Sequence, residues 1–74
     1  MYYNERIRFI RESQNMTQKE MAERLEINRV QYQKWESGKN VMSAENLYKI
    51  CKCLNVSADY ILGLPKDMPY PPIG

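Results

Sequence analysis

Five side chains within one short segment could bind the edges of nucleic-acid bases. Arg29 carries a planar guanidinium that suits two neighbouring acceptors, such as O6 and N7 of guanine, and the Lys34 ammonium can reach the same atoms. Gln31 and Gln33 add amides, and Val30 offers an apolar surface that fits a thymine methyl group. This chemistry requires an element that presents the five side chains together on its surface.

The residues before this segment predict a first helix that begins at Gln18. Thr17 is a good N-cap, and Glu20 lies three residues later, so the hydroxyl and the carboxylate can satisfy the first free amides reciprocally. Its apolar positions recur at helical spacing and form one stripe: Met21, Ala22 and Leu25.

The segment itself predicts a second helix from about Arg29 to Ser37. Asn28 is a suitable N-cap, Gln31 repeats the capping spacing, and Gly38 can take the left-handed conformation that ends a helix. Tyr32 and Trp35 form an apolar pair three residues apart on its inner side.

The two helices are separated only by Glu26, Ile27 and Asn28, which is the spacing of a helix-turn-helix. Helices joined by so short a turn cross steeply and bury their apolar stripes together. Arg29, Val30, Gln33 and Lys34 are then expected to face outward, with Gln31 at the margin. In this class of motif the second helix enters the major groove of DNA.

The chain resembles the lambda-repressor-like, Cro/C1-type (XRE) helix-turn-helix family over roughly Asn4 to Leu64. The residues that carry the resemblance are Ala22, Ile27, Tyr32, Trp35, the ending Glu36-Ser37-Gly38-Lys39, and the stretch from Leu47 to Gly63, which is similar to the family's fourth and fifth helices. The resemblance implies an all-α, compact five-helix domain over residues 1–64.

Two positions depart from the family's pattern. Most relatives have Gly where this chain has Glu26, so a positive φ there would cost about 1 kcal/mol or more. Val30 stands where a small polar residue or an amide is usual, and its side chain cannot hydrogen-bond to a base.

The resemblance also implies an ion pair between Arg11 and Glu36. Arg11 lies on the apolar face of a helix predicted between Asn4 and Asn15, an unusual place for a cation. Glu36 lies at the end of the helix predicted from Arg29 to Ser37, called the recognition helix below. Such a pair would tie the two helices together. The alternative is two unrelated surface charges.

Phosphate contacts are expected on either side of the recognition helix. Gln18 stands at the first position of its helix, where free amides can hold a phosphate oxygen. Lys39 and Asn40 follow the end of the second helix, in a loop that relatives place on the opposite strand. For Lys39 the alternative is a role in complementing the helix dipole alone.

Outside this unit, further helices and a tail are predicted. Asn4 is expected to cap an N-terminal helix and Asn15 to end it. Ser43 and Ser57 are expected to cap two later helices, and residues 65–74 to form an extended proline-rich tail. The burial of Phe9 stays open. Cys51 is expected in the core.

Composition agrees with a small intracellular protein. The 74 residues are 43% hydrophobic and 27% charged, with a net charge of +2 whose excess lies in the first 40 residues. No apolar run approaches a membrane span, and the N-terminus is too charged for a signal peptide. A cytoplasmic location is expected. His is absent and no phosphate loop is present, so we expect no enzyme activity, metal or cofactor.

The sequence therefore predicts a transcriptional regulator, most simply a repressor, that binds a palindromic operator in double-stranded DNA as a homodimer. Candidate interface residues are Leu47, Tyr48, Tyr60, Ile61 and Tyr70, of which Leu47 and Ile61 are expected to belong to the monomer core. One alternative is an antitoxin-like protein that binds DNA and also a protein partner, such as a toxin or an anti-repressor. The other is an interaction module of the same fold without DNA binding.

Overall fold

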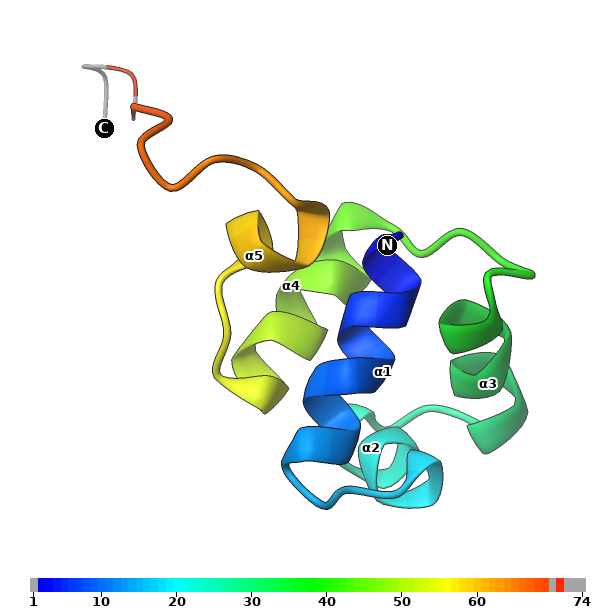
Figure 1. Ribbon diagram of the computed structural model, residues 1–74. Helices are drawn as coiled ribbons and strands as arrows, with labels where there is room; N and C mark the ends of the chain where they lie inside the picture. Colours follow the sequence, from blue (N-terminus) through cyan, green and yellow to red (C-terminus); the bar gives the residue numbers. More distant parts are fainter. Residues whose placement is uncertain (1, 70, 72–74) are drawn as a thin grey trace.

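A computed structural model describes residues 2–69 and 71. This part of the chain forms five α-helices and no strand, arranged as Figure 1 shows. The helices are α1 (Tyr3–Ser13), α2 (Gln18–Leu25), α3 (Arg29–Ser37), α4 (Ala44–Leu54) and α5 (Ala58–Leu62). None of these helices is long and apolar enough to span a bilayer. The expected all-α, five-helix fold is confirmed.

The capping residues of the helix-turn-helix lie where the sequence predicts them, with one exception. The Thr17 hydroxyl accepts from the Glu20 amide and the Glu20 carboxylate accepts from the Thr17 amide, both at 3.0 Å. Gly38 ends α3 with a φ of 83°. Asn28 caps α3 by accepting from the Val30 amide at 2.7 Å, and the capping spacing of Gln31 produces no second bond.

The first helix begins earlier than predicted, because Asn4 is not its cap. Tyr2 holds the N-cap position without a side-chain bond, and Asn4 lies inside α1. Its amide Nδ2 instead donates to the backbone oxygen of Glu36 at 3.0 Å, which connects α1 to the end of α3. Asn15 follows α1 in the left-handed conformation, with a φ of 58°, as expected.

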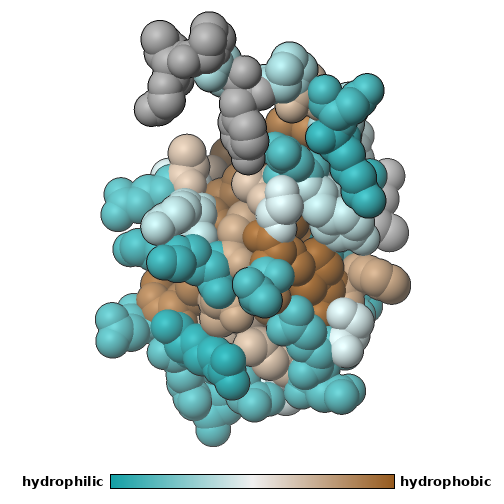
Figure 2. Space-filling view, turned by 90° about the vertical axis from the view of Figure 1, so that its left-hand side faces the viewer, coloured by the Kyte–Doolittle hydropathy of each residue, from teal (hydrophilic) through white to brown (hydrophobic). Residues whose placement is uncertain are grey.

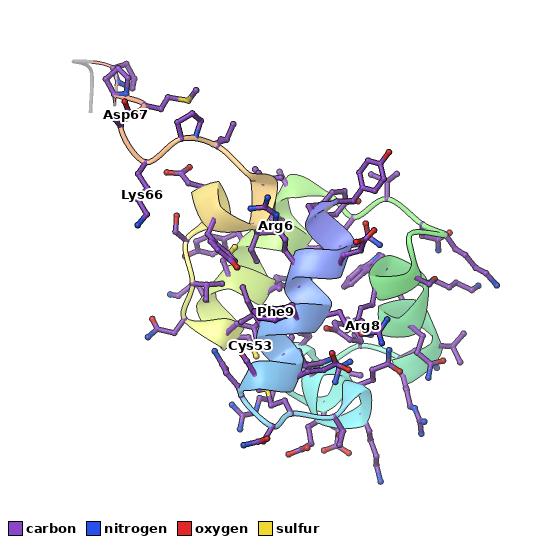
Figure 3. All side chains as sticks on the ribbon, viewed as in Figure 1. Arg6, Arg8, Phe9, Cys53, Lys66 and Asp67 are labelled. Carbon is purple, nitrogen blue, oxygen red and sulfur yellow. The ribbon has the colours of Figure 1, made fainter. Side chains whose placement is uncertain are left out.

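Ser43 and Ser57 cap α4 and α5 through their hydroxyls, as predicted. Beyond Gly63, the chain leaves the helical body in Figure 1, and Figure 3 places Lys66 and Asp67 on this outlying part. Its described residues, 64–69 and 71, are not helical. One turn interrupts it, in which the Met68 amide donates to the Pro65 oxygen at 3.3 Å.

The helices pack around α1, which lies between α3 and α5 in Figure 1, while α2 contacts both α3 and α4. The fully buried side chains come from all five helices: Ile7, Met21, Tyr32, Ile50, Leu54 and Ile61. Cys51 is buried, as predicted, whereas Phe9 is 57% exposed. Leu25 and Ile27 pack against the core at half burial. The core thus fixes the crossing of α2 and α3.

Glu26 takes the left-handed conformation at the end of α2, with φ 57° and ψ 43°, although it carries a side chain. Because Gly adopts this conformation without a steric penalty, we expect Glu26→Gly to stabilise the fold by about 1 kcal/mol. Glu23→Gly, at an exposed position inside α2, is the matched control and should destabilise by a similar amount. Urea unfolding of both variants measures the difference. Equal losses of unfolding free energy in Glu26→Gly and Glu23→Gly would contradict backbone strain at Glu26.

Candidate nucleic-acid interface

The outer face of α3 carries the five residues expected to contact bases. Tyr32 and Trp35 point into the core, which turns the opposite side of the helix to solvent. Arg29, Val30 and Lys34 are exposed, with 55% of Val30 accessible. The other two, Gln31 and Gln33, are half-buried.

A shallow surface hollow brings predicted base and phosphate contacts together. Its lining comes from the start of α2, the outer side of α3 and the following loop, and consists of Gln18, Val30, Gln33, Lys34, Ser37 and Lys39. Arg29 and Gln31 lie outside this lining. Asn40 is half-buried. Its backbone N–H donates to the backbone oxygen of Lys34 at 3.2 Å, so the loop folds back onto the end of α3.

Arg11 and Glu36 form a buried ion pair behind this surface. The guanidinium donates through Nε and one terminal nitrogen to the two carboxylate oxygens of Glu36, at 2.9 and 2.7 Å. The side chains are only 8% and 2% exposed. A further Arg11 nitrogen donates to the Met16 oxygen at 2.6 Å. The guanidinium therefore joins α1, the loop before α2, and α3.

A chain of hydrogen bonds connects the Arg11–Glu36 pair to the surface. Gln18 donates through Nε2 to Oε1 of Glu36 at 3.1 Å, and Gln33 donates through Nε2 to Oε1 of Gln18 at 3.2 Å. One continuous network thus connects the buried charge with a side chain of the hollow.

The charges in this network favour an ionised Glu36. Burial opposes ionisation of the carboxyl group, but the hydrogen bonds from Arg11 and Gln18 and the positive charge of Arg11 outweigh it, so the pKa of Glu36 is lowered. The Tyr32 hydroxyl is buried beside the carboxylate without a well-formed hydrogen bond. Burial, and then the Glu36 carboxylate, raise the pKa of Tyr32 above its ordinary range.

Sequence reasoning missed two residues that line this region. Arg8 and Ser37 line a second, polar hollow together with Gln18, Gln33 and Glu36, and Figure 3 shows Arg8 on the side of α1 nearer α3. Arg8 is exposed and lies 3.6 Å from Glu12. Its spacing from Arg11 places it on the same side of α1 as the ion pair, which is a signal that the sequence did contain.

Two crossing helices with a three-residue turn, an exposed polar face on the second helix and three supporting helices define a helix-turn-helix protein of the lambda-repressor type. A sequence model of the helix-turn-helix domain family matches residues 4–66. The chain belongs to this family, in its Cro/C1-type branch.

Curated relatives in bacteria and a phage have related sequences. The transcriptional activator BcrR of Enterococcus faecalis is 39% identical over 62 residues, which are 84% of this chain and 30% of BcrR. The cryptic phage CTXphi repressor RstR of Vibrio cholerae is 38% identical over 85% of this chain and 56% of RstR. The regulator DicA of Escherichia coli is 36% identical over 93% of this chain and 52% of DicA. The chain spans about half or less of these relatives.

A solved structure has the same arrangement of helices. The P22 c2 repressor protein, in complex with a synthetic operator, superposes with a TM-score of 0.76 and 29% sequence identity. The match covers 84% of this chain and 94% of the repressor chain.

Proposed function

We propose that this protein is a sequence-specific DNA-binding transcriptional regulator that acts as a repressor by occluding a promoter. The observation that carries the proposal is the surface hollow, where Val30, Gln33 and Lys34 of α3 stand beside Gln18 and Lys39. Base-reading and phosphate-holding side chains thus share one surface. The similar P22 c2 repressor is in complex with a synthetic operator, which supports DNA as the ligand of this fold.

In the proposed complex the N-terminal part of α3 enters the major groove, and α2 crosses above the backbone. Arg29 and Lys34 donate to guanine acceptors, and Val30 packs on a thymine methyl group. Gln31 and Gln33 lie at the flanks of this contact. Gln18, Lys39 and Asn40 hold phosphates, which fixes the register of α3 on the duplex.

The protein is proposed to bind as a homodimer on a palindromic operator. One small domain covers too little DNA for strong selectivity, and two domains on half-sites about 34 Å apart solve this problem. Tyr48 and Tyr60 are exposed and available for the interface, Leu47 is half-buried, and Ile61 is fully buried. Tyr70 lies outside the described residues. Figure 2 shows apolar side chains reaching the surface on the face that carries α4 and α5.

Residues 1–64 form the proposed DNA-binding domain and 65–74 its tail. Selection of bound sites from random duplexes tests the function directly, because it returns the consensus, its symmetry and the half-site spacing together. We expect a palindrome with half-sites one helical turn apart. Selected sites without a consensus would contradict sequence-specific binding. An asymmetric consensus with a single half-site would contradict binding as a dimer.

Two lysines should respond differently to truncation. We expect Lys34→Ala to weaken operator binding and to relax the preference at one or two base pairs, by about 1 to 3 kcal/mol. Lys39→Ala, in the loop after α3, should lower affinity equally on all sequences, because a phosphate contact carries no sequence information. Site selection with both variants measures the base preference at each position of the operator, and binding to fixed duplexes measures the affinity. A changed consensus for Lys39→Ala would refute its assignment to phosphate.

A further inference from the structure

The hydrogen-bonded network behind α3 has a direction. Glu36 accepts from Gln18 at 3.1 Å, and Gln18 accepts from Gln33 at 3.2 Å through its carbonyl oxygen Oε1. No described residue donates to Oε1 of Gln33. The network therefore runs from the buried ion pair to Gln33, which lines the surface hollow with Val30 and Lys34.

Glu36 sets this direction, because an ionised carboxylate only accepts hydrogen bonds. Its contact with the Arg11 guanidinium keeps it ionised. Gln18 must then turn its NH₂ group toward Glu36, which leaves its carbonyl oxygen for the next residue. Gln33 in turn must point its NH₂ group at that oxygen. Neither amide can flip without placing two acceptors against each other.

The fixed amide of Gln33 offers a defined edge. Its nitrogen carries two hydrogens, of which Gln18 accepts one. When that hydrogen is the one anti to Oε1, the syn hydrogen and Oε1 form a donor beside an acceptor. The major-groove edge of adenine has the complementary pair, the N6 amino donor and the N7 acceptor. Guanine presents two acceptors, O6 and N7, and is a poor match.

We propose that Gln33 reads an adenine in the operator, and that Glu36 and Gln18 are positioning residues that fix the direction of its amide. This inference rests on the proposed function and deepens it, since it assigns a base to a residue at the flank of the recognition helix. The preference for one base would thus depend on the ion pair that connects α1 and α3.

Site selection with the full chain and its variants tests the assignment. The wild-type consensus should contain an adenine, preferred over guanine by roughly ten-fold or more, whose preference disappears in Gln33→Met while the other positions keep theirs. Guanine at the position that Gln33→Met affects would overturn the proposal. So would a consensus that Gln33→Met leaves unchanged.

One substitution of Gln18 and a matched control test the positioning role. Gln18→Met removes the link between Glu36 and Gln33, so the adenine preference should fall to below about three-fold. The control is Lys39→Ala, which removes a proposed phosphate contact without touching the network. It should lower overall affinity and retain the adenine preference. Loss of the adenine preference in both variants, or in neither, would overturn the positioning role.

Thermal unfolding by circular dichroism checks that both variants are folded at the temperature of selection. The Arg11–Glu36 pair is untouched in both, so cooperative unfolding is expected. Failure of the inference is distinguishable from failure of the proposed function. If the wild-type chain returns a consensus but Gln18→Met keeps the full adenine preference, only the positioning role is overturned. If the wild-type chain returns no consensus, both proposals are overturned.

Discussion

Arg11→Ala is expected to destabilise the fold by about 3 to 5 kcal/mol, because it leaves the carboxylate of Glu36 buried without its cation. The Glu36 side chain is 2% exposed, so its charge is largely shielded from water in the folded protein. A chain of this length has a stability on the order of 4 to 11 kcal/mol, so much of it would be lost. Urea unfolding of the wild type, Arg11→Ala and Glu36→Ala measures the effect.

A double-mutant cycle separates the pair from the other bonds of Arg11. Arg11 also donates to the Met16 oxygen, so part of the Arg11→Ala loss does not involve Glu36. The double variant should lose less stability than the two single losses combined, by about 1 to 3 kcal/mol. Additive losses would show that the two charges do not stabilise each other.

The pH dependence of stability provides a second measurement of the same pair. The pKa of Glu36 is lowered in the folded state, so its contribution is present above the unfolded-state pKa of a glutamate and is lost as pH falls through the folded-state value. The wild type should therefore lose stability on acidification more steeply than the Arg11→Ala/Glu36→Ala variant. Parallel profiles of the two proteins would contradict a coupled titration of Glu36.

Local capping signals predicted the helix-turn-helix well, because their bonds close within a few residues. The reciprocal bonds of Thr17 and Glu20 depend only on the first turn of α2. Gly38 and Asn15 likewise end their helices through backbone conformations set by their own residue types. The short turn predicted the crossing of the two helices, and the three-residue spacing of Tyr32 and Trp35 predicted that they are buried, as they are.

Side chains whose partners are distant in sequence were beyond this reasoning. Asn4 was expected to cap α1 because its residue type suits a cap, but its amide donates to a backbone oxygen 32 residues away. The hydrogen bond between Gln18 and Gln33 forms only because the crossing of α2 and α3 brings these two side chains together. Sequence placed both glutamines at the DNA surface and could not show that they contact each other. The same holds for Arg8 beside the polar hollow.

Burial of the ion pair has a consequence for how the interface binds. Because Arg11 is occupied by Glu36, its charge is not available to phosphate in the proposed DNA complex, and we expect the exposed cations near α3 to supply the electrostatic attraction. Those that line the two hollows are Lys34 and Lys39 in one and Arg8 in the other. The number of such side chains, more than the net charge of +2, sets the salt dependence of binding.

Operator affinity of the wild-type protein is therefore expected to fall steeply with salt, by roughly a thousand-fold between 50 and 200 mM for a dimer that contacts about six phosphates. Because each lost phosphate contact lowers the slope of log K against log salt by about one, Lys39→Ala should reduce the slope by about two in the dimer. Fluorescence anisotropy on the selected operator, over a series of KCl concentrations, measures both slopes. Lys66→Ala removes an exposed lysine on the segment that leaves the helical body after α5, and as the matched control it should leave the slope nearly unchanged. A wild-type slope near zero would exclude phosphate contacts as the source of affinity, and an unchanged slope for Lys39→Ala would remove that residue from the interface.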